Sequence, residues 1–278
     1  MISGTTRIIA HLGVPTASFR APLIYNPYFE AEAIDCAVVP MGCEAADLPV
    51  LLPALFRLRN IAGALITMPH KVAVTALLDH ASVAVRACGA CNAVRREADG
   101  SLSGDMFDGA GFVRGAERHG QRLAGAAALV VGAGGVGAAI AVALAGAGVA
   151  RIGLSDLDQG AARRLAERLR AGFPGLDVTT GAADPTGRDI VVNATPLGMR
   201  PDDPLPVDPD RLAPGCLVGD VVLSEEVTPF LAAARARGCR TQVGLDMLFE
   251  QIPAYLEFFG LPVTSADRLR HLARLPRG

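Results

Sequence analysis

The chain has 278 residues, with 26 basic and 28 acidic side chains and a formal net charge of -2. This near balance provides no broad positive field of the kind that binds nucleic acid or an anionic membrane, so we expect a small-molecule partner and neither nucleic acid nor membrane. No secretory signal opens the chain and no apolar run reaches the roughly 18 residues that span a bilayer, so we expect a cytoplasmic protein, either a monomer or a homodimer. A chain of this length is expected to form two domains.

The first part of the chain, up to about residue 110, alternates apolar strand-like runs with helical stretches, which predicts an α/β domain. It contains no glycine-rich nucleotide-binding loop. The predicted strands are Arg7–Leu12, Ala37–Met41, Ala64–Thr67 and Ala90–Arg95, and the predicted helices are Leu23–Ala33, Leu48–Arg57 and Val72–Leu78.

Lys71 is the only lysine in the chain, and every other basic residue is an arginine. A lysine retained in such a composition indicates a position that needs an amine able to lose its proton, which a guanidinium group does not do at physiological pH. Chance survival of one lysine would explain the composition as well. The composition by itself therefore leaves the role of Lys71 open.

The cysteines do not predict a metal site. Cys88 and Cys91 form a C-x-x-C pair, but no second Cys or His pair follows at metal-site spacing, and we interpret the pair as two small residues packed in a turn. The six cysteines are scattered through a chain large enough to fold without cross-links, so we expect reduced thiols.

From about Leu123 the pattern changes to that of a nucleotide-binding domain. An apolar run, Ala127–Val131, leads into a glycine-rich segment and then a small-residue helix, Ala138–Gly146. The next predicted strands are Arg151–Leu154, Ile190–Ala194 and Leu217–Val222. This alternation predicts a doubly wound, Rossmann-type domain with a parallel sheet.

Two helical segments, Met247–Phe259 and Ala266–Leu275, come too late in the chain to belong to that sheet. We expect them to pack on the first domain and so make it discontinuous. The predicted domains are then a substrate-binding and catalytic domain, residues 1–110 plus 245–278, and an NAD-binding Rossmann domain, residues 111–244.

The glycine-rich segment has the G-x-G-x-x-G pattern in its diagnostic context, directly after a strand and before a helix. The first glycine permits the tight turn, the second lets the backbone approach a diphosphate, and the third allows close packing of the helix. The diphosphate then rests on the helix N-terminal amides. The predicted cofactor-binding residues of this segment are Gly132, Ala133, Gly134, Gly135, Val136 and Gly137.

Asp156 ends the second strand of the Rossmann pattern, close to the spacing at which an acidic residue binds ribose hydroxyls. A carboxylate there accepts hydrogen bonds from a 2′-hydroxyl and repels a 2′-phosphate. No Arg flanks it, and Asp158 adds negative charge. We therefore predict NAD as the cofactor, with NADP the less favoured of the two.

Segments along nearly the whole chain resemble motifs of the shikimate and quinate dehydrogenases. The stretch Thr67–Lys71 is similar to the family's Thr-x-Pro-His-Lys, and Gly104–Gly109 is similar to its Gly-x-Asn-Thr-Asp-Gly. Further matches, in the family's order, are Gly89–Val94, Asn193–Met199, Thr228–Pro229 and Gly244–Gln251. Because several ordered matches are far more specific than one, the chain is identified as a member of this family.

The resemblance implies hydride transfer between a ring carbon and C4 of a nicotinamide, with Lys71 as base in oxidation and acid in reduction and Asp108 beside it on the same hydroxyl. It also implies substrate contacts from Thr67, Asn92 and Gln251. The cofactor contacts that it implies in the second domain are Thr195, Val221 and Gly244.

The chain departs from the family at the segment that binds the substrate carboxylate and at other positions of the substrate pocket. Phe19 and Ala21 stand where the family has a Ser-x-Ser, and Leu65, Met106 and Leu223 replace an Asn, a Thr and a Tyr. Each change removes a hydrogen-bonding group, and an unpaired buried group costs roughly 1 to 3 kcal/mol, more for a charge. Shikimate and quinate are therefore not the expected best substrates.

Two readings of the altered site stay open. In one, the substrate is a related ring alcohol or ketone whose acidic group is absent, masked or held elsewhere, by Arg20, Ser18 or Thr16. In the other, an alicyclic hydroxy acid still binds, less tightly, to a rearranged set of groups. Ser18, Phe19, Ala21 and Leu223 thus join the expected substrate-binding positions. A rival of another class is a non-catalytic, dinucleotide-sensing homologue.

Overall fold

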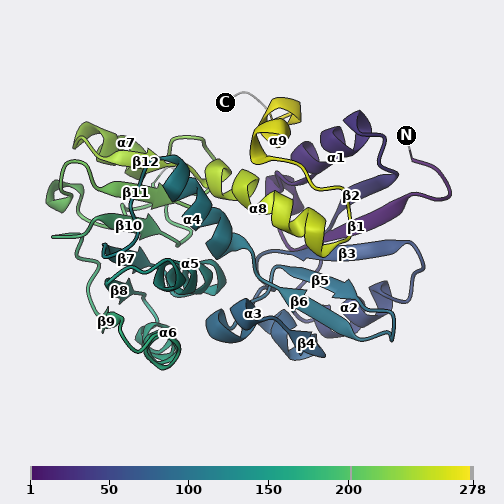
Figure 1. Ribbon diagram of the computed structural model, residues 1–278, viewed down its shortest axis with the longest axis horizontal. Helices are drawn as coiled ribbons and strands as arrows, with labels where there is room; N and C mark the ends of the chain where they lie inside the picture. Colours follow the sequence, from purple (N-terminus) through teal and green to yellow (C-terminus); the bar gives the residue numbers. More distant parts are fainter. Residues whose placement is uncertain (1, 201, 276–278) are drawn as a thin grey trace. The chain divides into compact units, whose positions relative to one another are not determined.

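The computed structural model describes residues 2–200 and 202–275, which form two compact units of mixed α/β structure (Figure 1). The described residues of the first unit fall within Met1–Phe107 and Gln251–Arg277, and those of the second within Asp108–Glu250. The predicted α/β fold class is confirmed. The predicted domain limits, 1–110 plus 245–278 and 111–244, stay predictions, and their residues 1, 201 and 276–278 lie outside the described part.

The first unit is built on a mixed sheet with the strand order β2-β1-β3-β5-β6-β4. Strand β1 is parallel to β2 and β3, whereas β5 is antiparallel to both β3 and β6. The strands are β1 (Arg7–Leu12), β2 (Cys36–Met41), β3 (Ile61–Ile66), β4 (His80–Ala81), β5 (Ala93–Arg96) and β6 (Leu102–Asp105).

Helices from both ends of the chain pack in this first unit. Helix α1 contacts β2 and also α9, from the C-terminal segment. The hydroxyl of Tyr28 donates to the carbonyl of Pro262 at 2.8 Å, and Arg268 pairs with Glu32 at 3.0 Å. The helices of this unit are α1 (Pro22–Ala31), α2 (Leu48–Leu55), α3 (Val83–Cys88), α9 (Ala266–Leu272) and the end of α8 (Gly244–Phe258), with the 3₁₀ turns η1 (Thr16–Ser18) and η2 (Ala73–Leu77).

The second unit is built on a parallel sheet with the order β12-β11-β10-β7-β8-β9, visible as a ladder of labels in Figure 1. This is the Rossmann strand order. The first three strands, β7 to β9, run outward on one side of β7, and the chain then crosses back to add β10 to β12 on its other side. The strands are β7 (Ala127–Val131), β8 (Arg151–Ser155), β9 (Asp177–Thr180), β10 (Ile190–Asn193), β11 (Leu217–Asp220) and β12 (Arg240–Gln242).

The helices of the second unit are α4 (Asp108–Arg118), α5 (Gly135–Gly146), α6 (Gln159–Gly172), α7 (Pro229–Ala236) and the start of α8, with the 3₁₀ turn η3 (Pro209–Arg211). Every residue of β7 is buried, as expected of a parallel strand covered on both faces. Within the described ranges, no helix of either unit is both long and apolar enough to cross a membrane.

Several predicted bounds shift by a few residues, and three predicted elements differ from the observed ones for reasons visible in the local backbone. Helix α5 begins at Gly135 instead of Ala138, because Gly134 already has the extended conformation of an N-cap. The predicted helix Val72–Leu78 is the short 3₁₀ turn η2. The predicted helix Ala266–Leu275 ends at Leu272, where Ala273 turns to ψ 141° and the amide of Arg274 donates to the carbonyl of Leu23 on α1.

Candidate active site

The second unit gathers its predicted cofactor residues at one edge of its sheet. Strands β7 and β10 are neighbours and parallel, so the turns that follow them leave the sheet at the same edge. This is the point where the strand order reverses, and ligands of doubly wound sheets bind in the crevice formed there. The glycine-rich turn follows β7, and Ala194 and Thr195 follow β10.

The glycines of the turn are required by close backbone contacts. Gly132 has φ of +102°, and a β-carbon there would lie 2.6 Å from the carbonyl oxygen of Ala194. A β-carbon on Gly137 would overlap the carbonyl oxygen of Gly132 and meet that of Ala194 at 3.2 Å. Gly134 is different, since it is exposed and a β-carbon there would have nothing within 4 Å. The turn is therefore tight at its ends and open at its middle.

Asp156 hydrogen-bonds to the glycine turn itself. Its carboxylate accepts from the amide of Ala133 at 2.6 Å and from the amide of Asp158 at 2.8 Å. The carboxylate is partly exposed, so it holds the turn after β7 while keeping access to a ligand. A ribose hydroxyl could donate to the same group.

A buried polar network holds the loop that follows β10, the strand beside β7. The carboxylate of Asp220 accepts from Asn193 Nδ2 at 3.0 Å, from the amide of Val222 at 3.0 Å and from the Thr228 hydroxyl at 2.7 Å. Burial raises the pKa of Asp220 above its ordinary value, although these hydrogen bonds oppose the shift. Asn193 Oδ1 in turn accepts from the amide and hydroxyl of Thr195, at 3.1 and 2.6 Å. The network thus fixes the loop after β10.

Gly244, the first residue of α8, lies against the segment after β11. A β-carbon on Gly244 would be 2.5 Å from the carbonyl oxygen of Val222 and 3.0 Å from Cδ2 of Leu223. The carbonyl carbon of Val221 would lie 3.1 Å from it. The predicted cofactor residues Val221 and Gly244 and the predicted substrate residue Leu223 are therefore neighbours.

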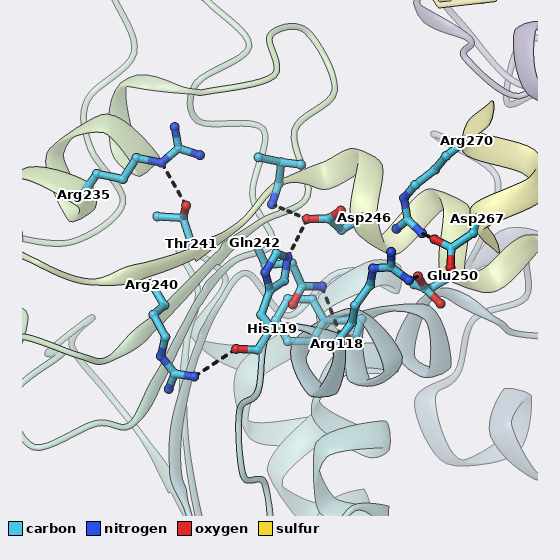
Figure 2. A network of polar contacts seen from close by, with 12 residues as sticks. Arg118, His119, Arg235, Arg240, Thr241, Gln242, Asp246, Glu250, Asp267 and Arg270 are labelled. Carbon is cyan, nitrogen blue, oxygen red and sulfur yellow. Dashed lines mark hydrogen bonds and ion pairs between the residues drawn. The ribbon is translucent and has the colours of Figure 1, made fainter. Parts of the chain in front are cut away.

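The start of α8 is attached to α4 and β12 by polar contacts, shown in Figure 2. Asp246 accepts from the amide of Val243 at 3.3 Å and lies 2.9 Å from Nε2 of His119. Gln242 Nε2 donates to the carbonyl of Phe112 at 3.1 Å. These contacts position the backbone that leads into Gly244.

In the first unit, Lys71 follows β3 at the carboxyl edge of the sheet. Its side chain is partly buried, and its carbonyl accepts from the amide of Cys91 at 2.8 Å. The amide of Thr67 donates to the carbonyl of Leu12 at 2.9 Å, which joins the ends of β3 and β1. Beside Lys71, the ring of His70 is buried, and its Nε2 lies 2.7 Å from the carbonyl oxygen of Cys43 and must be the donor. This hydrogen bond ties the turn after β3 to Cys43, and Nδ1 of the same ring has no hydrogen-bond partner among the described residues.

Asn92 and Asp108 are both buried, and a hydrogen bond joins Asn92 to the residue before Asp108. Oδ1 of Asn92 accepts from the amide of Phe107 at 3.0 Å, so the Asn92 side chain holds the residue directly before Asp108. Asp108 is 2% exposed and begins α4, where the helix dipole favours a carboxylate. Asn92 thus has at least one structural hydrogen bond.

The altered anchor segment lies at the same edge as Lys71. Ser18 is exposed and its hydroxyl donates to the carbonyl of Pro15 at 2.8 Å, while Ala21 is buried at the start of α1. Leu65 and Met106 are each 4% exposed. They are core side chains at positions where the resemblance implies polar ones.

Gln251 is buried in α8, and its Oε1 has no hydrogen-bond partner among the described residues. An unpaired buried acceptor is uncommon and is consistent with a group kept for a ligand. Two residues of interest were missed by the sequence analysis. Asp220, at the end of β11, and His11, near the end of β1, give no signal in the sequence beyond their polarity in an apolar strand.

The described groups of the second unit fit a dinucleotide. The first-turn amides of α5 have no intrahelical acceptor and suit a diphosphate, the open position at Gly134 leaves room for it, and Asp156 suits a ribose. Among the residues that the structure describes, no group of three or more His, Cys, Asp or Glu side chains could hold a metal ion.

The sequence is similar to known proteins over nearly its whole length. Residues 12–94, which include Phe19, Lys71 and Asn92, match the family of the shikimate dehydrogenase substrate binding domain. The chain is 37% identical over 278 residues to the shikimate dehydrogenase (NADP(+)) of Rhodospirillum rubrum, covering 97% of this chain and 98% of that protein.

Two solved structures are similar over nearly the full length. The quinate dehydrogenase of Corynebacterium glutamicum, solved in complex with NAD, is 32% identical with a TM-score of 0.84, over 96% of this chain and 98% of the other. The 5-ketofructose reductase of Gluconobacter sp. strain CHM43 is 29% identical with a TM-score of 0.85, over 97% and 99%.

Gly137→Ala should lower the stability of the protein, whereas Gly134→Ala should weaken cofactor binding. At Gly137 the new methyl group overlaps the Gly132 carbonyl, so we expect a loss of roughly 1–3 kcal/mol in the free energy of unfolding, measured by urea denaturation. At Gly134 we expect a change within about 0.5 kcal/mol but weaker NAD binding by calorimetry, because the methyl group enters the open part of the turn. Equal urea midpoints for the two variants would contradict the packing argument.

Asp220→Ala and Asp220→Asn test the buried network. Alanine leaves three donors without an acceptor, and we expect it to destabilise the protein by roughly 2–4 kcal/mol. Asparagine keeps one oxygen for Asn193 and Val222, while the Thr228 hydroxyl can rotate to accept from the new amide, so most of the stability should return. If both variants unfold at the same urea concentration, the carboxylate is not the centre of the network.

Proposed function

We propose that this chain, which belongs to the shikimate dehydrogenase family, transfers a hydride between a nicotinamide and the hydroxyl or ketone carbon of a small alicyclic substrate. Family membership rests on the full-length match to the Rhodospirillum rubrum enzyme. The protein is thus a shikimate dehydrogenase-like oxidoreductase that uses a nicotinamide dinucleotide. The substrate, the roles of individual residues and the choice between NAD and NADP belong to the proposal.

The observation that carries the proposal is the placement of Lys71. The chain's only lysine is partly buried at the carboxyl edge of its sheet, directly after the Thr67–His70 turn, with its carbonyl held by Cys91. When bound, the nicotinamide supplies the two-electron chemistry by accepting or donating a hydride at C4. In oxidation, Nζ of Lys71 takes the hydroxyl proton as the carbonyl forms, and in reduction it returns that proton to the oxygen.

We assign Asp108 to the same step, as the carboxylate that hydrogen-bonds the reacting hydroxyl and orients the amine. It is buried at the start of α4, where the helix dipole stabilises a carboxylate in its charged form. Thr67, Asn92 and Gln251 are the proposed substrate contacts. The cofactor contacts are proposed from Gly132 to Gly137, Asp156, Thr195, Val221 and Gly244.

We infer that shikimate and quinate are not the best substrates. Phe19, Ala21, Leu65, Met106 and Leu223 supply no hydroxyl or amide at positions where the family pattern has one. A wider substrate range is supported by the similarity to a 5-ketofructose reductase, which is named for a keto sugar.

Lys71→Ala should lower kcat by roughly 10²–10⁴-fold, the usual contribution of a general base, while NAD affinity changes little. The assay is NAD reduction with a panel of cyclic polyols and hydroxy acids, and Arg59→Ala, which removes an exposed cation, is the matched control. If Lys71 and Asp108 act as one unit, Lys71→Ala/Asp108→Asn should be no slower than Lys71→Ala alone.

Turnover that survives Lys71→Ala unchanged would refute the catalytic assignment. NAD binding without turnover of any compound on the panel would favour the alternative, a non-catalytic dinucleotide-sensing protein.

Asp156→Ala should shift the ratio of NAD to NADP affinity toward NADP by about tenfold, the effect of one charged hydrogen bond and one removed repulsion. The ratio is the readout, since loss of the hydrogen bond to the Ala133 amide could weaken both cofactors alike. Asp177→Ala is the matched control, because Asp177 is exposed and lies at the amino end of its strand, away from the glycine turn. An unaltered ratio would contradict the proposed NAD preference, against which the NADP(+) named for the Rhodospirillum rubrum relative already stands.

A further inference from the structure

His11 is a buried polar residue with one ring nitrogen that no other group of the described chain uses. It is 8% exposed, and its Nδ1 has no partner among the described residues. Its ring stacks on Phe19, with centroids 4.0 Å apart and planes inclined by 26°. Since buried polar groups nearly always have a partner, an unmatched imidazole beside a proposed substrate site calls for a functional explanation.

The stacked rings lie at the sheet edge where Thr67 and Lys71 follow β3. His11 is the register partner of Leu65, so the two side chains share one face of the sheet. A β-carbon on Gly13 would lie 2.5 Å from Thr67 Cγ2 and 3.3 Å from Phe19 Cζ. The Phe19 ring is therefore held next to both His11 and the turn that leads to Lys71.

The charge at this edge is set by Lys71. Burial, and secondly the positive charge of Lys71, lower the pKa of His11 from its ordinary value of 6.5 to about 3. The imidazole is thus neutral throughout the physiological range. A ligand on this face meets an aromatic ring and an uncharged imidazole.

We propose that His11 and Phe19 determine specificity for an uncharged ring substrate, whose hydroxyl or carbonyl group hydrogen-bonds to His11 while its ring packs on Phe19. This inference rests on the proposed dehydrogenase function and names its substrate class. A neutral hydroxyl is satisfied by one hydrogen bond to imidazole, whereas a buried carboxylate needs a positive partner. The cation that acts on His11 is Lys71, and a carboxylate paired with it would hold the amine as ammonium and remove it from its role as base.

The test compares shikimate with its primary carboxamide, two probes of nearly equal shape that differ by one charge. Isothermal titration with saturating NADH, which cannot take a hydride from either alcohol, measures binding, and NAD reduction measures kcat and KM separately. We expect the carboxamide to bind at least about tenfold more tightly than shikimate, since an ion left without a partner loses at least one strong hydrogen bond.

Two pairs of variants assign this preference to the two residues. Phe19→Ser should shift the affinity ratio toward shikimate by about tenfold, whereas Phe19→Ala, which adds no hydroxyl, should weaken both probes without that shift. His11→Leu should raise KM for the carboxamide by about tenfold with kcat changed less than about threefold, and His11→Gln, which keeps a neutral hydrogen-bonding group, should restore much of the affinity. His80→Leu, on exposed β4, is the control.

Failure of this inference is distinguishable from failure of the proposed reaction. Preferential binding of the carboxamide without turnover would refute the reaction and support the recognition by His11 and Phe19. Shikimate binding as tightly as the carboxamide, or neither probe binding, would overturn the inference. A preference for shikimate that is lost in Arg20→Gln would identify Arg20 as an acid anchor instead, which also overturns it.

Discussion

The cofactor half of the molecule depends on one steric constraint, the contact of Gly137 with the carbonyl oxygen of Gly132. Because Gly137 has no side chain, the two backbones can approach this closely, and α5 can begin almost immediately after β7. The early start brings the free amides of the helix to the sheet edge where the strand order reverses. The hydrogen bond from the Ala133 amide to Asp156 then ties this turn to the end of β8. These contacts fix the positions of the two groups proposed to bind a diphosphate and a ribose, the first amides of α5 and the Asp156 carboxylate.

The buried polar groups are of two kinds, those paired within the protein and those with an unpaired atom. The Asp220 carboxylate accepts hydrogen bonds from three donors and, through Asn193, holds the loop that carries Thr195. Its hydrogen-bonding capacity therefore stabilises the fold. Asn92 holds the amide of Phe107. His11 Nδ1 and Gln251 Oε1 have no such partner among the described residues. In a low-dielectric interior, a network whose polar groups are all hydrogen-bonded stabilises one conformation. An unpaired polar group lowers stability, and a ligand that hydrogen-bonds to it can offset that loss.

Much of the cofactor site could be predicted from the sequence because it is local. The strand, glycines and helix around Gly132 follow one another directly, and the spacing to Asp156 is set by one βαβ unit. The family resemblance, which the full-length relative confirms, supplied the candidate residues of the first unit. The path of the chain between β1 and α1 could not be read from pattern alone. The stacking of Phe19 on His11 depends on the η1 turn and on space at Gly13, neither of which has a periodic signature.

The presence of a single lysine has a practical consequence for spectroscopy. Isotope labelling of lysine would place one ε-ammonium probe in a chain of 278 residues, at Lys71. Its NMR signal would need no assignment, and changes on adding a nicotinamide dinucleotide or a ring compound would be reported from the proposed reaction centre itself. In this protein a whole-residue label acts as a site-specific one.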